Sequence, residues 1–397
     1  MPEQIRTAVV GVGAQGRMYA QLIADGRAPS LQLAALCSAN PNSTNLAAHQ
    51  ATAAGLGVEL FTDYAQLLAS GSIDAVVITT PHYEHPAMAL AAVQAGIHVL
   101  LEKPAGIDAK SVGQLFDAAD ARPEVTLAMM FNQRANPLYA DLKALIDSGE
   151  LGELRRTSWL ISHWWRPDAY YTSSPWRASW GGEGGGVLVN QAPHQLDLWT
   201  WLCGMPTRCF ARIQFGYRRD ITVDDEVATL LEFPGGAPGT FNTCTNDLVG
   251  TDRLEMGFDR GRIVVDDSAR VTVWRYTDAE RTIARQISPA DAAKVPSGAF
   301  DRTIFHNAET REYSSPWGEQ HALVLDNFGK HIIDGTPLIA PGRDGLNSVR
   351  LANAMYLSAW TGTDIELDSL DDDLFFTELN KRIAAEGRYP QRTGLTS

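Results

Sequence analysis

A glycine-rich segment near the start of the chain has the residue types and spacing that bind a pyrophosphate. The segment reads Gly11-Val12-Gly13-Ala14-Gln15-Gly16. A β-prone run precedes it and a helical pattern follows it, so its glycines allow a tight turn, a close approach of the backbone to phosphate and close packing of the helix on the strand. The free N–H groups at the start of that helix, at Ala14 and Gln15, then face the phosphates. The context predicts a dinucleotide site, although a plain glycine loop is the alternative for the motif taken alone.

The end of the next strand-like run bears on the choice of dinucleotide. An acidic residue at this place normally binds the ribose 2′-hydroxyl, but here the chain reads Cys37-Ser38-Ala39-Asn40. With Ser38 no carboxylate repels a 2′-phosphate, yet no Lys or Arg between residues 38 and 50 neutralises one. Because an uncompensated charge is costly to bind, we favour NAD and leave NADP open.

Two further polar segments each follow an apolar strand-like run. The runs at 73–79 and 97–101 lead into Thr80-Pro81-His82-Tyr83-Glu84-His85 and Glu102-Lys103-Pro104. Ligands of an open parallel sheet bind outside the carboxyl ends of its strands, so we expect both segments at the cofactor edge. The histidines of the first segment can line the mouth of a site or cap the next helix, and both alternatives stay open.

A glycine-rich turn and a helix in the second half carry a histidine and a carboxylate. The segment reads Gly184-Gly185-Gly186-Val187-Leu188-Val189-Asn190-Gln191-Ala192-Pro193-His194-Gln195-Leu196-Asp197 and continues to Trp201-Leu202-Cys203-Gly204. With the earlier segments, in this order, it resembles the signatures of the glucose-fructose oxidoreductase and inositol dehydrogenase (Gfo/Idh/MocA) superfamily. The resemblance covers nearly the whole chain. It implies an NAD(P)-dependent oxidoreductase that acts on a sugar or polyol.

Oxidation of a secondary alcohol requires a base for the hydroxyl proton and a cation or donor for the oxygen. The resemblance implies that Lys103 contacts the reacting oxygen beside the nicotinamide and that His194 is the general base. A solvated lysine and a satisfied, half-buried helix histidine are the alternatives. Asp197 shares a helix face with His194 and can fix the imidazole tautomer, unless it is a surface carboxylate favoured by the helix dipole.

One position departs from the family pattern. Many members carry an acidic residue where this chain has Asn190, and an amide cannot take a proton. We therefore assign any acid or base work at that place to His194 or Lys103. Because Pro193 marks a nearby helix start, Asn190 can either contact substrate or cap that helix.

The resemblance also implies the cofactor and substrate contacts. Those for the cofactor are Gly11, Gly13, Ala14, Gln15, Gly16, Ser38, Thr80, Pro81, His85, Glu102 and Lys103. Those for the substrate are Lys103, Tyr83, Arg134, Trp165, Arg166, Trp176, Arg177, Asn190 and His194. The second set includes residues from a stretch rich in aromatics, between residues 159 and 180, whose flat faces suit sugar rings. The alternative is that these side chains pack in a core, as most large aromatics do. This density favours a substrate larger than a monosaccharide, such as a glycoside.

The elements that must position these residues divide the chain in two. Strand-like runs at 6–10, 31–36, 73–79, 97–101 and 125–131 alternate with helical segments. This alternation predicts a doubly wound parallel sheet in a Rossmann domain over residues 1–131. Alternating stretches, turn residues and later helices predict an α+β domain with a large open, mostly antiparallel sheet over 132–397. Its uncovered sheet face predicts a homodimer or homotetramer.

Composition narrows the partners. The 397 residues suit two domains, and 47 acidic against 33 basic residues give a net charge of −14, which disfavours nucleic acid and anionic membranes. No apolar stretch is long enough to span a bilayer, and the start of the chain shows no signal-peptide pattern. The cysteines are scattered without CxxC pairing, so we expect a reducing cytoplasm. No group has metal-ligand spacing, so we expect no metal.

Three functions remain after these exclusions. The first is a freely reversible dehydrogenase that oxidises a secondary hydroxyl of a sugar, glycoside or cyclic polyol. The second is a redox-neutral enzyme with tightly bound cofactor, which oxidises its substrate transiently to drive epimerisation or elimination. The third is a ligand-sensing regulator on the same fold. Lys103 and His194 favour the first over the third, because a sensor has no need of a base beside the nicotinamide.

Overall fold

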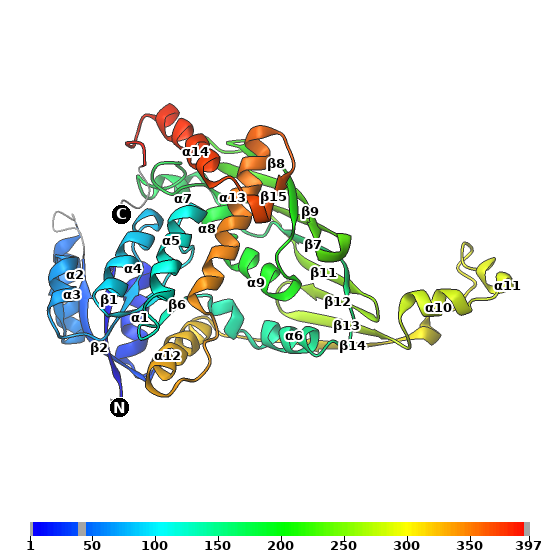
Figure 1. Ribbon diagram of the computed structural model, residues 1–397, viewed down its shortest axis with the longest axis horizontal. Helices are drawn as coiled ribbons and strands as arrows, with labels where there is room; N and C mark the ends of the chain where they lie inside the picture. Colours follow the sequence, from blue (N-terminus) through cyan, green and yellow to red (C-terminus); the bar gives the residue numbers. More distant parts are fainter. Residues whose placement is uncertain (1–2, 39–44, 393–397) are drawn as a thin grey trace.

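The computed structural model describes residues 3–38 and 45–392. Its first sheet is parallel, with the strand order β3-β2-β1-β4-β5-β6 (Figure 1). The strands are β1 (Ile5–Val10), β2 (Leu31–Cys37), β3 (Glu59–Phe61), β4 (Ala75–Ile78), β5 (His98–Leu101) and β6 (Leu127–Met129). This order confirms the predicted doubly wound sheet. The short strand β3 was not among the predicted runs.

Helices cover both faces of this sheet, as the unbroken apolar strands require. They are α1 (Ala14–Ala24), α2 (Leu46–Leu56), α3 (Tyr64–Ala69), α4 (His85–Gln94) and α5 (Ala109–Asp120). Successive side chains of β1 enter different cores: Val10 packs with the cluster that contains Phe116 of α5, and Val9 packs with the cluster that contains Tyr19 of α1. The glycine turn between β1 and α1 is therefore fixed from both sides.

One helix of the second half packs on the first sheet. α12 (Glu319–Asp334) places Phe328 in the same buried cluster as Val9. Its Asp326 accepts a hydrogen bond from the Ser30 amide at 3.0 Å, immediately before β2. The sequence predicts a second domain over residues 132–397, and α12 lies within that range although its apolar face packs in the core of the first sheet.

The second sheet is open and mostly antiparallel, as predicted. Its strand order is β14-β13-β12-β11-β7-β10-β9-β8-β15, and β7 and β10 pair in parallel. The strands are β7 (Leu154–Ile161), β8 (Arg208–Phe215), β9 (Asp224–Phe233), β10 (Ala237–Cys244), β11 (Asp252–Phe258), β12 (Gly261–Asp266), β13 (Arg270–Tyr276), β14 (His306–Glu312) and β15 (Ile365–Glu366). One face buries Trp159 and Phe241 in the core, whereas Leu160 and Leu230 are 42% and 61% exposed on the other.

Helices on the buried face join the two domains. They include α6 (Pro137–Asp147), α9 (Pro193–Cys203), α13 (Gly345–Thr361) and α14 (Asp372–Glu386). α13 lies between the sheets (Figure 1), and the amide of Asn353 donates to the Ile107 carbonyl and accepts from the Ala109 amide at 2.8 and 2.9 Å. These bonds hold the loop after β5 against the second domain, which fixes the segment that carries Lys103.

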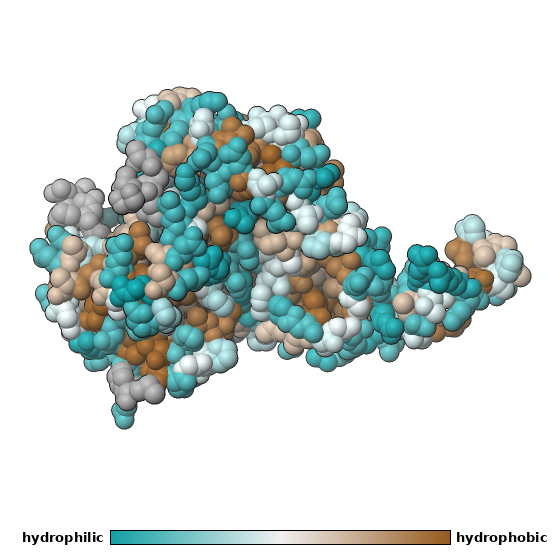
Figure 2. Space-filling model, viewed as in Figure 1, coloured by the Kyte–Doolittle hydropathy of each residue, from teal (hydrophilic) through white to brown (hydrophobic). Residues whose placement is uncertain are grey.

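An arm extends from the second sheet, away from the rest of the molecule (Figure 1). It contains the short helices α10 (Glu280–Gln286) and α11 (Pro289–Ala292). Hydrophobic residues lie on its surface (Figure 2), including Val295 and Ile304, which are 44% and 62% exposed. No helix in the described part of the chain is long and apolar enough to cross a membrane.

Candidate active site

Three glycines between β1 and α1 shape an open cradle. Gly11 has a φ of +94°, and a Cβ there would lie 2.8 Å from the Thr79 carbonyl oxygen. A Cβ on Gly16 would lie 1.9 Å from the Gly11 oxygen, whereas a Cβ on Gly13 would meet no atom within 4 Å. Protein packing thus requires glycine at the first and third positions. Gly13 instead borders open space, as a residue beside a bound pyrophosphate must.

The start of α1 leaves backbone donors for a ligand. Gly13 is the N-cap and makes no side-chain capping bond, and Ala14 is exposed. The side chain of Gln15 turns inward and donates to the Tyr19 hydroxyl at 2.7 Å. The described residues therefore fit a phosphate at this helix terminus through backbone N–H groups. Thr79, which the sequence reading missed, supports the turn by donating to the Gly11 oxygen at 2.7 Å.

The expected ribose position lies at the end of β2. Ser38 is buried, and its hydroxyl lies 3.0 Å from Nδ1 of His49 in α2. Burial lowers the pKa of His49, and the charge of Arg17 lowers it further. Arg17 comes from α1, outside the stretch that the sequence reading searched for a cation. Ala39 and Asn40 lie outside the described residues.

The segment after β4 is locked to the segment after β5. The ring nitrogens of His85 lie 2.7 and 2.8 Å from the carbonyl oxygens of Pro104 and Thr80. His85 is only 1% exposed, so it joins the two loops instead of lining the cofactor site as predicted. Pro81 is exposed at the sheet edge. The neighbouring His82 is also buried, and its Nδ1 lies 3.1 Å from the Glu183 carbonyl oxygen.

Glu102 and Lys103 lie where the first sheet meets the second domain. The buried Glu102 carboxylate accepts hydrogen bonds from the Tyr19 hydroxyl and from the Lys103 amide, so both oxygens hold protein groups. The Lys103 side chain reaches across the domains, and its Nζ donates to the Asn190 carbonyl at 3.1 Å. Burial lowers the pKa of Lys103, while the charges of Glu102 and Glu183 act to raise it. The ammonium of Lys103 is therefore more acidic than that of a solvated lysine.

A carboxylate that the sequence reading missed lies next to Asn190. Glu183 is 2% exposed, accepts from the Ala178 amide at 2.7 Å and accepts from the side-chain amide of Asn190. Burial raises the pKa of Glu183 to about 7. Asn190 therefore does not cap α9, whose N-cap is Ala192. Its amide holds the Glu183 carboxylate instead.

The short helix α8 (Val187–Asn190) is anchored by a remote carboxylate. Asp224, the first residue of β9, accepts from the Gly186 and Leu188 amides at 2.6 and 2.9 Å and from the Tyr356 hydroxyl at 2.5 Å. A Cβ on Gly186 would lie 2.0 Å from the Asp224 carbonyl oxygen, so only glycine allows this approach. The Asn190 carbonyl is thereby held in place for Lys103.

His194 lies at the start of α9 and has a largely apolar setting. Its ring is 6.4 Å from that of Phe131, edge to face, and its buried Nδ1 has no hydrogen-bond partner among the described residues. Burial lowers the pKa of His194 well below the usual value, and the charges of Lys103 and His321 lower it further. His321 in α12 was not predicted. The sequence offered no signal for it, because α12 comes from a distant part of the chain.

Asp197 and Arg134 differ from their predicted roles. Arg134 donates to both carboxylate oxygens of Asp197 at 2.9 and 2.6 Å and to Asp344 at 2.6 Å. The side chains of Arg134 and Asp197 are 2% and 1% exposed. The Asp197 carboxylate therefore does not orient His194, and the Arg134 guanidinium is not free for substrate. A buried charge requires a partner of opposite charge, and Arg134 and Asp197 are such partners for each other.

The aromatic crowd separates into core and site. Trp159 and Trp180 are buried, whereas Trp165 is 41% exposed. The hydroxyl of Tyr170 in α7 (Asp168–Thr172) accepts hydrogen bonds from the side chains of Arg177, Asn190 and Gln191 at 2.7, 3.1 and 3.1 Å.

The predicted arginines lie against aromatic rings. Arg177 lies over the rings of Tyr170 and Trp176, and Arg166 also lies over Tyr170. Both arginine charges lower the pKa of Lys103, which places them near it. Tyr83 does not join this group, because its hydroxyl donates to the Trp180 carbonyl and its ring packs under Arg392.

Sequence comparison matches both halves of the chain to one family. Residues 5–130 match the family described as oxidoreductase family, NAD-binding Rossmann fold, and residues 139–264 match the GFO/IDH/MocA C-terminal domain. The chain belongs to the Gfo/Idh/MocA oxidoreductase family. This confirms the resemblance drawn from the glycine motif and the segments around Lys103 and His194.

Individual relatives support this assignment over almost the full length. Scyllo-inositol 2-dehydrogenase (NAD(+)) of Bacillus subtilis is 24% identical over 93% of this chain and 98% of its own. The WlbA dehydrogenase of Bordetella pertussis, solved in complex with NADH and UDP-GlcNAcA, is 26% identical with a TM-score of 0.73 and covers 93% of this chain and 100% of its own. Levoglucosan dehydrogenase in complex with NADH shares the fold, with 22% identity and a TM-score of 0.75, over 92% and 99% of the two chains.

Proposed function

We propose that this protein is an NAD-dependent dehydrogenase that oxidises a secondary hydroxyl of a sugar, glycoside or cyclic polyol, or reduces the corresponding ketone. The observation that carries the proposal is the convergence of Lys103 and His194. Lys103 extends from the cofactor edge of the parallel sheet to the Asn190 carbonyl, His194 lies at the start of a helix of the other domain, and the charge of Lys103 lowers the pKa of His194. The names of the inositol and WlbA relatives support a polyol or sugar substrate.

The cofactor in this proposal lies along the glycine turn. The open space at Gly13 and the free N–H groups of α1 suit its pyrophosphate. Thr80 and Pro81 border it at the next strand end, and Ser38 lies near its adenosine ribose. We propose NAD, as the family description and the lack of a cation after β2 favour. The charge of Arg17 acts on His49, which lies next to Ser38, so a 2′-phosphate has a cation to use and both dinucleotides belong in the assay.

The reaction removes a hydride from carbon and a proton from oxygen. When bound, the nicotinamide supplies the hydride acceptor. His194 is neutral near pH 7 because burial lowers its pKa, so it can accept the hydroxyl proton. Lys103 uses one N–H bond on the Asn190 carbonyl, and its remaining N–H groups can donate to the substrate oxygen as negative charge develops there. The products are a ketone, the reduced cofactor and a protonated base.

Glu183 completes the proposed proton chemistry. Its negative charge raises the pKa of Lys103 and so opposes the effect of burial. Because burial raises the pKa of Glu183 to about 7, it changes charge in the same range in which an enzyme works. We assign to it the tuning of Lys103, with Asn190 as the group that holds it in place.

The test follows NADH absorbance while monosaccharides, glycosides and inositols are offered with NAD or NADP. Wild type and Lys103→Ala are run in parallel. Turnover in the wild type that the variant loses supports the proposal and identifies cofactor and substrate class together. If no compound yields net reduction and the purified protein carries bound cofactor, the protein is redox-neutral and the dehydrogenase proposal fails.

We also propose that the protein forms a homodimer or homotetramer. The open sheet face presents Leu160 and Leu230, and the projecting arm presents Val295 and Ile304. Apolar side chains gathered on an uncovered face favour a protein partner. Light scattering of the wild type and of Leu230→Glu tests this. A wild type that is monomeric at micromolar concentration contradicts it.

A further inference from the structure

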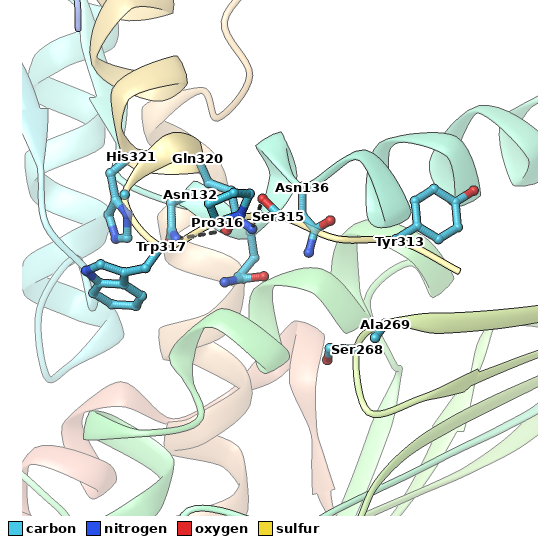
Figure 3. Close-up of a pocket in the computed structure, with 12 residues that line it drawn as sticks. Asn132, Asn136, Ser268, Ala269, Tyr313, Ser315, Pro316, Trp317, Gln320 and His321 are labelled. Carbon is cyan, nitrogen blue, oxygen red and sulfur yellow. Dashed lines mark hydrogen bonds between the residues drawn. The ribbon is translucent and has the colours of Figure 1, made fainter. Parts of the chain in front are cut away.

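A cavity of about 340 Å³ lies between the 3-10 turn Asn132–Ala135, the start of α12 and the turn before β13. Figure 3 shows Trp317 and His321 at one end of it and Ser268 at the other, with Asn132 and Gln320 between them. Small-molecule sites occupy roughly 300–1,000 Å³. The cavity is thus large enough for one ring of a ligand.

The lining is polar but almost without charge. Among the described residues that line the cavity, none is Lys, Arg, Asp or Glu, and burial lowers the pKa of His321 to about 4, which leaves it neutral near pH 7. Amide side chains dominate, including Gln133 and Asn136 beside the central pair. Amides and hydroxyls both donate and accept hydrogen bonds. A neutral, hydroxyl-bearing ligand matches this lining, whereas a phosphate or carboxylate finds no cation.

The two central amides, Asn132 and Gln320, leave one buried acceptor without a hydrogen-bond partner among the described residues. Asn132 donates to Gln320 at 3.2 Å, and Gln320 donates to Ser315 at 2.8 Å. The Oδ1 of Asn132 and the Nδ1 of His321 are buried without a partner among the described residues, although these residues are only 3% and 5% exposed. Buried polar atoms are normally hydrogen-bonded, so these two atoms call for a donor or acceptor from a ligand.

An aromatic surface stands at the end of the cavity. Trp317 is 80% exposed, and its ring lies 5.1 Å from that of His321. The exposed flat face of this indole suits the apolar face of a sugar ring. The amides and the indole together form the combination that recognises a carbohydrate.

His321 links this cavity to the reaction centre. It lines the cavity, and its ring lies 5.8 Å from that of Tyr19, whose hydroxyl donates to Glu102 next to Lys103. The cavity therefore borders the proposed site of hydride transfer.

We propose that this cavity is a subsite for the non-reacting ring of a glycoside or disaccharide. The proposal rests on the proposed dehydrogenase function and names its substrate class. The reacting ring lies between Lys103 and His194, while Asn132, Gln320 and Trp317 bind the neutral second ring. A free monosaccharide leaves the subsite empty.

The test compares disaccharides and methyl glycosides with their parent monosaccharides, using wild type, Trp317→Ala and Gln320→Leu. Leu323→Ala is the matched control, because it truncates an apolar side chain in the nearby helix α12, and this side chain is 52% exposed and outside the cavity lining. We expect Trp317→Ala to lower kcat/KM for the two-ring substrates about tenfold or more, the factor that corresponds to about 1.4 kcal/mol. The parent monosaccharides should change less than about twofold, and the control should match the wild type.

A binding measurement separates this proposal from the proposed function. Titration of maltose and cellobiose into Lys103→Ala with NADH present, with and without Trp317→Ala, reports the subsite without turnover. Binding that the second substitution abolishes supports the subsite even if no net oxidation is found. Turnover with equal losses for one-ring and two-ring substrates, or a wild type that prefers every monosaccharide, overturns the subsite and leaves the dehydrogenase intact.

Discussion

Replacement of Asp197 by asparagine separates a structural role from a catalytic one. The substitution leaves the Arg134 guanidinium buried, with Asp344 as its remaining partner, whose side chain is 35% exposed. Removal of one member of a buried ion pair costs about 3–5 kcal/mol. Because the Asp344 contact is retained, we expect Asp197→Asn to lower the free energy of unfolding by about 3 kcal/mol. Urea unfolding followed by circular dichroism measures this free energy.

Two further variants set the scale of that measurement. The double variant Arg134→Met with Asp197→Leu removes both buried charges and should lie within about 2 kcal/mol of the wild type, since an apolar replacement often matches a buried pair. Glu124→Gln breaks the surface pair with Arg122, whose side chains are 60% and 41% exposed, and should cost less than about 1 kcal/mol.

The same variant also tests whether Asp197 acts on His194. With both carboxylate oxygens on Arg134, Asp197→Asn should leave the pH dependence of kcat/KM unchanged at temperatures where it remains folded. If Asp197→Asn unfolds at the same urea concentration as the wild type but has a shifted pH profile of kcat/KM, this reasoning is refuted. That result would show a carboxylate that orients the imidazole.

Four other substitutions follow from the site geometry. Gly13→Ala should fold like the wild type and lose NADH affinity in a fluorescence titration. Gly16→Ala should instead lower the melting temperature, because its Cβ would lie 1.9 Å from the Gly11 oxygen. Equal melting temperatures for the two variants would contradict this. Burial raises the pKa of Glu183 to about 7, so its stabilising contribution is present below about pH 4.5 and is lost as pH rises toward 7. Glu183→Gln should therefore gain about 3 kcal/mol relative to the wild type between about pH 5 and pH 8, and a constant difference in thermal melts would show a normal pKa. His194→Gln should lower kcat about 10²–10⁴-fold with NADH binding intact, and unchanged turnover would exclude it as the base.

Local sequence signals predicted the fold well because the Rossmann strands and glycine turn are specified by neighbours in the chain. The bounds of β1 and α1 follow from apolar runs and glycine spacing. The placement of α12 could not be predicted in this way, since an amphipathic pattern shows that a helix has a buried face but not which sheet covers it. Its Phe328 enters the core of the first sheet, and so His321 reaches the site.

The same limit explains the errors at the site. Lys103 and His194 were predicted because their motifs are local. Arg134 and Asp197 are far apart in the chain, and their pairing becomes visible only when the 3-10 turn Asn132–Ala135 meets α9. Tyr83 lies next to a cofactor segment in sequence, yet its ring packs against the C-terminal segment. Proximity in sequence identified the region in each case, but side-chain direction decided the role.

The departure at Asn190 is compensated within the same short segment. An acid was expected at this position, and the sequence reading transferred its work to Lys103 and His194. The backbone instead turns back through Gly184, which has a φ of +88°, and brings the Glu183 carboxylate onto the Asn190 amide. The Glu183 carboxylate therefore acts on Lys103 from a position seven residues before Asn190. It is buried, accepts from the Asn190 side-chain amide and pairs with Arg177 at 3.6 Å. The amide at position 190 thus accompanies an acid beside Lys103 and holds it in place.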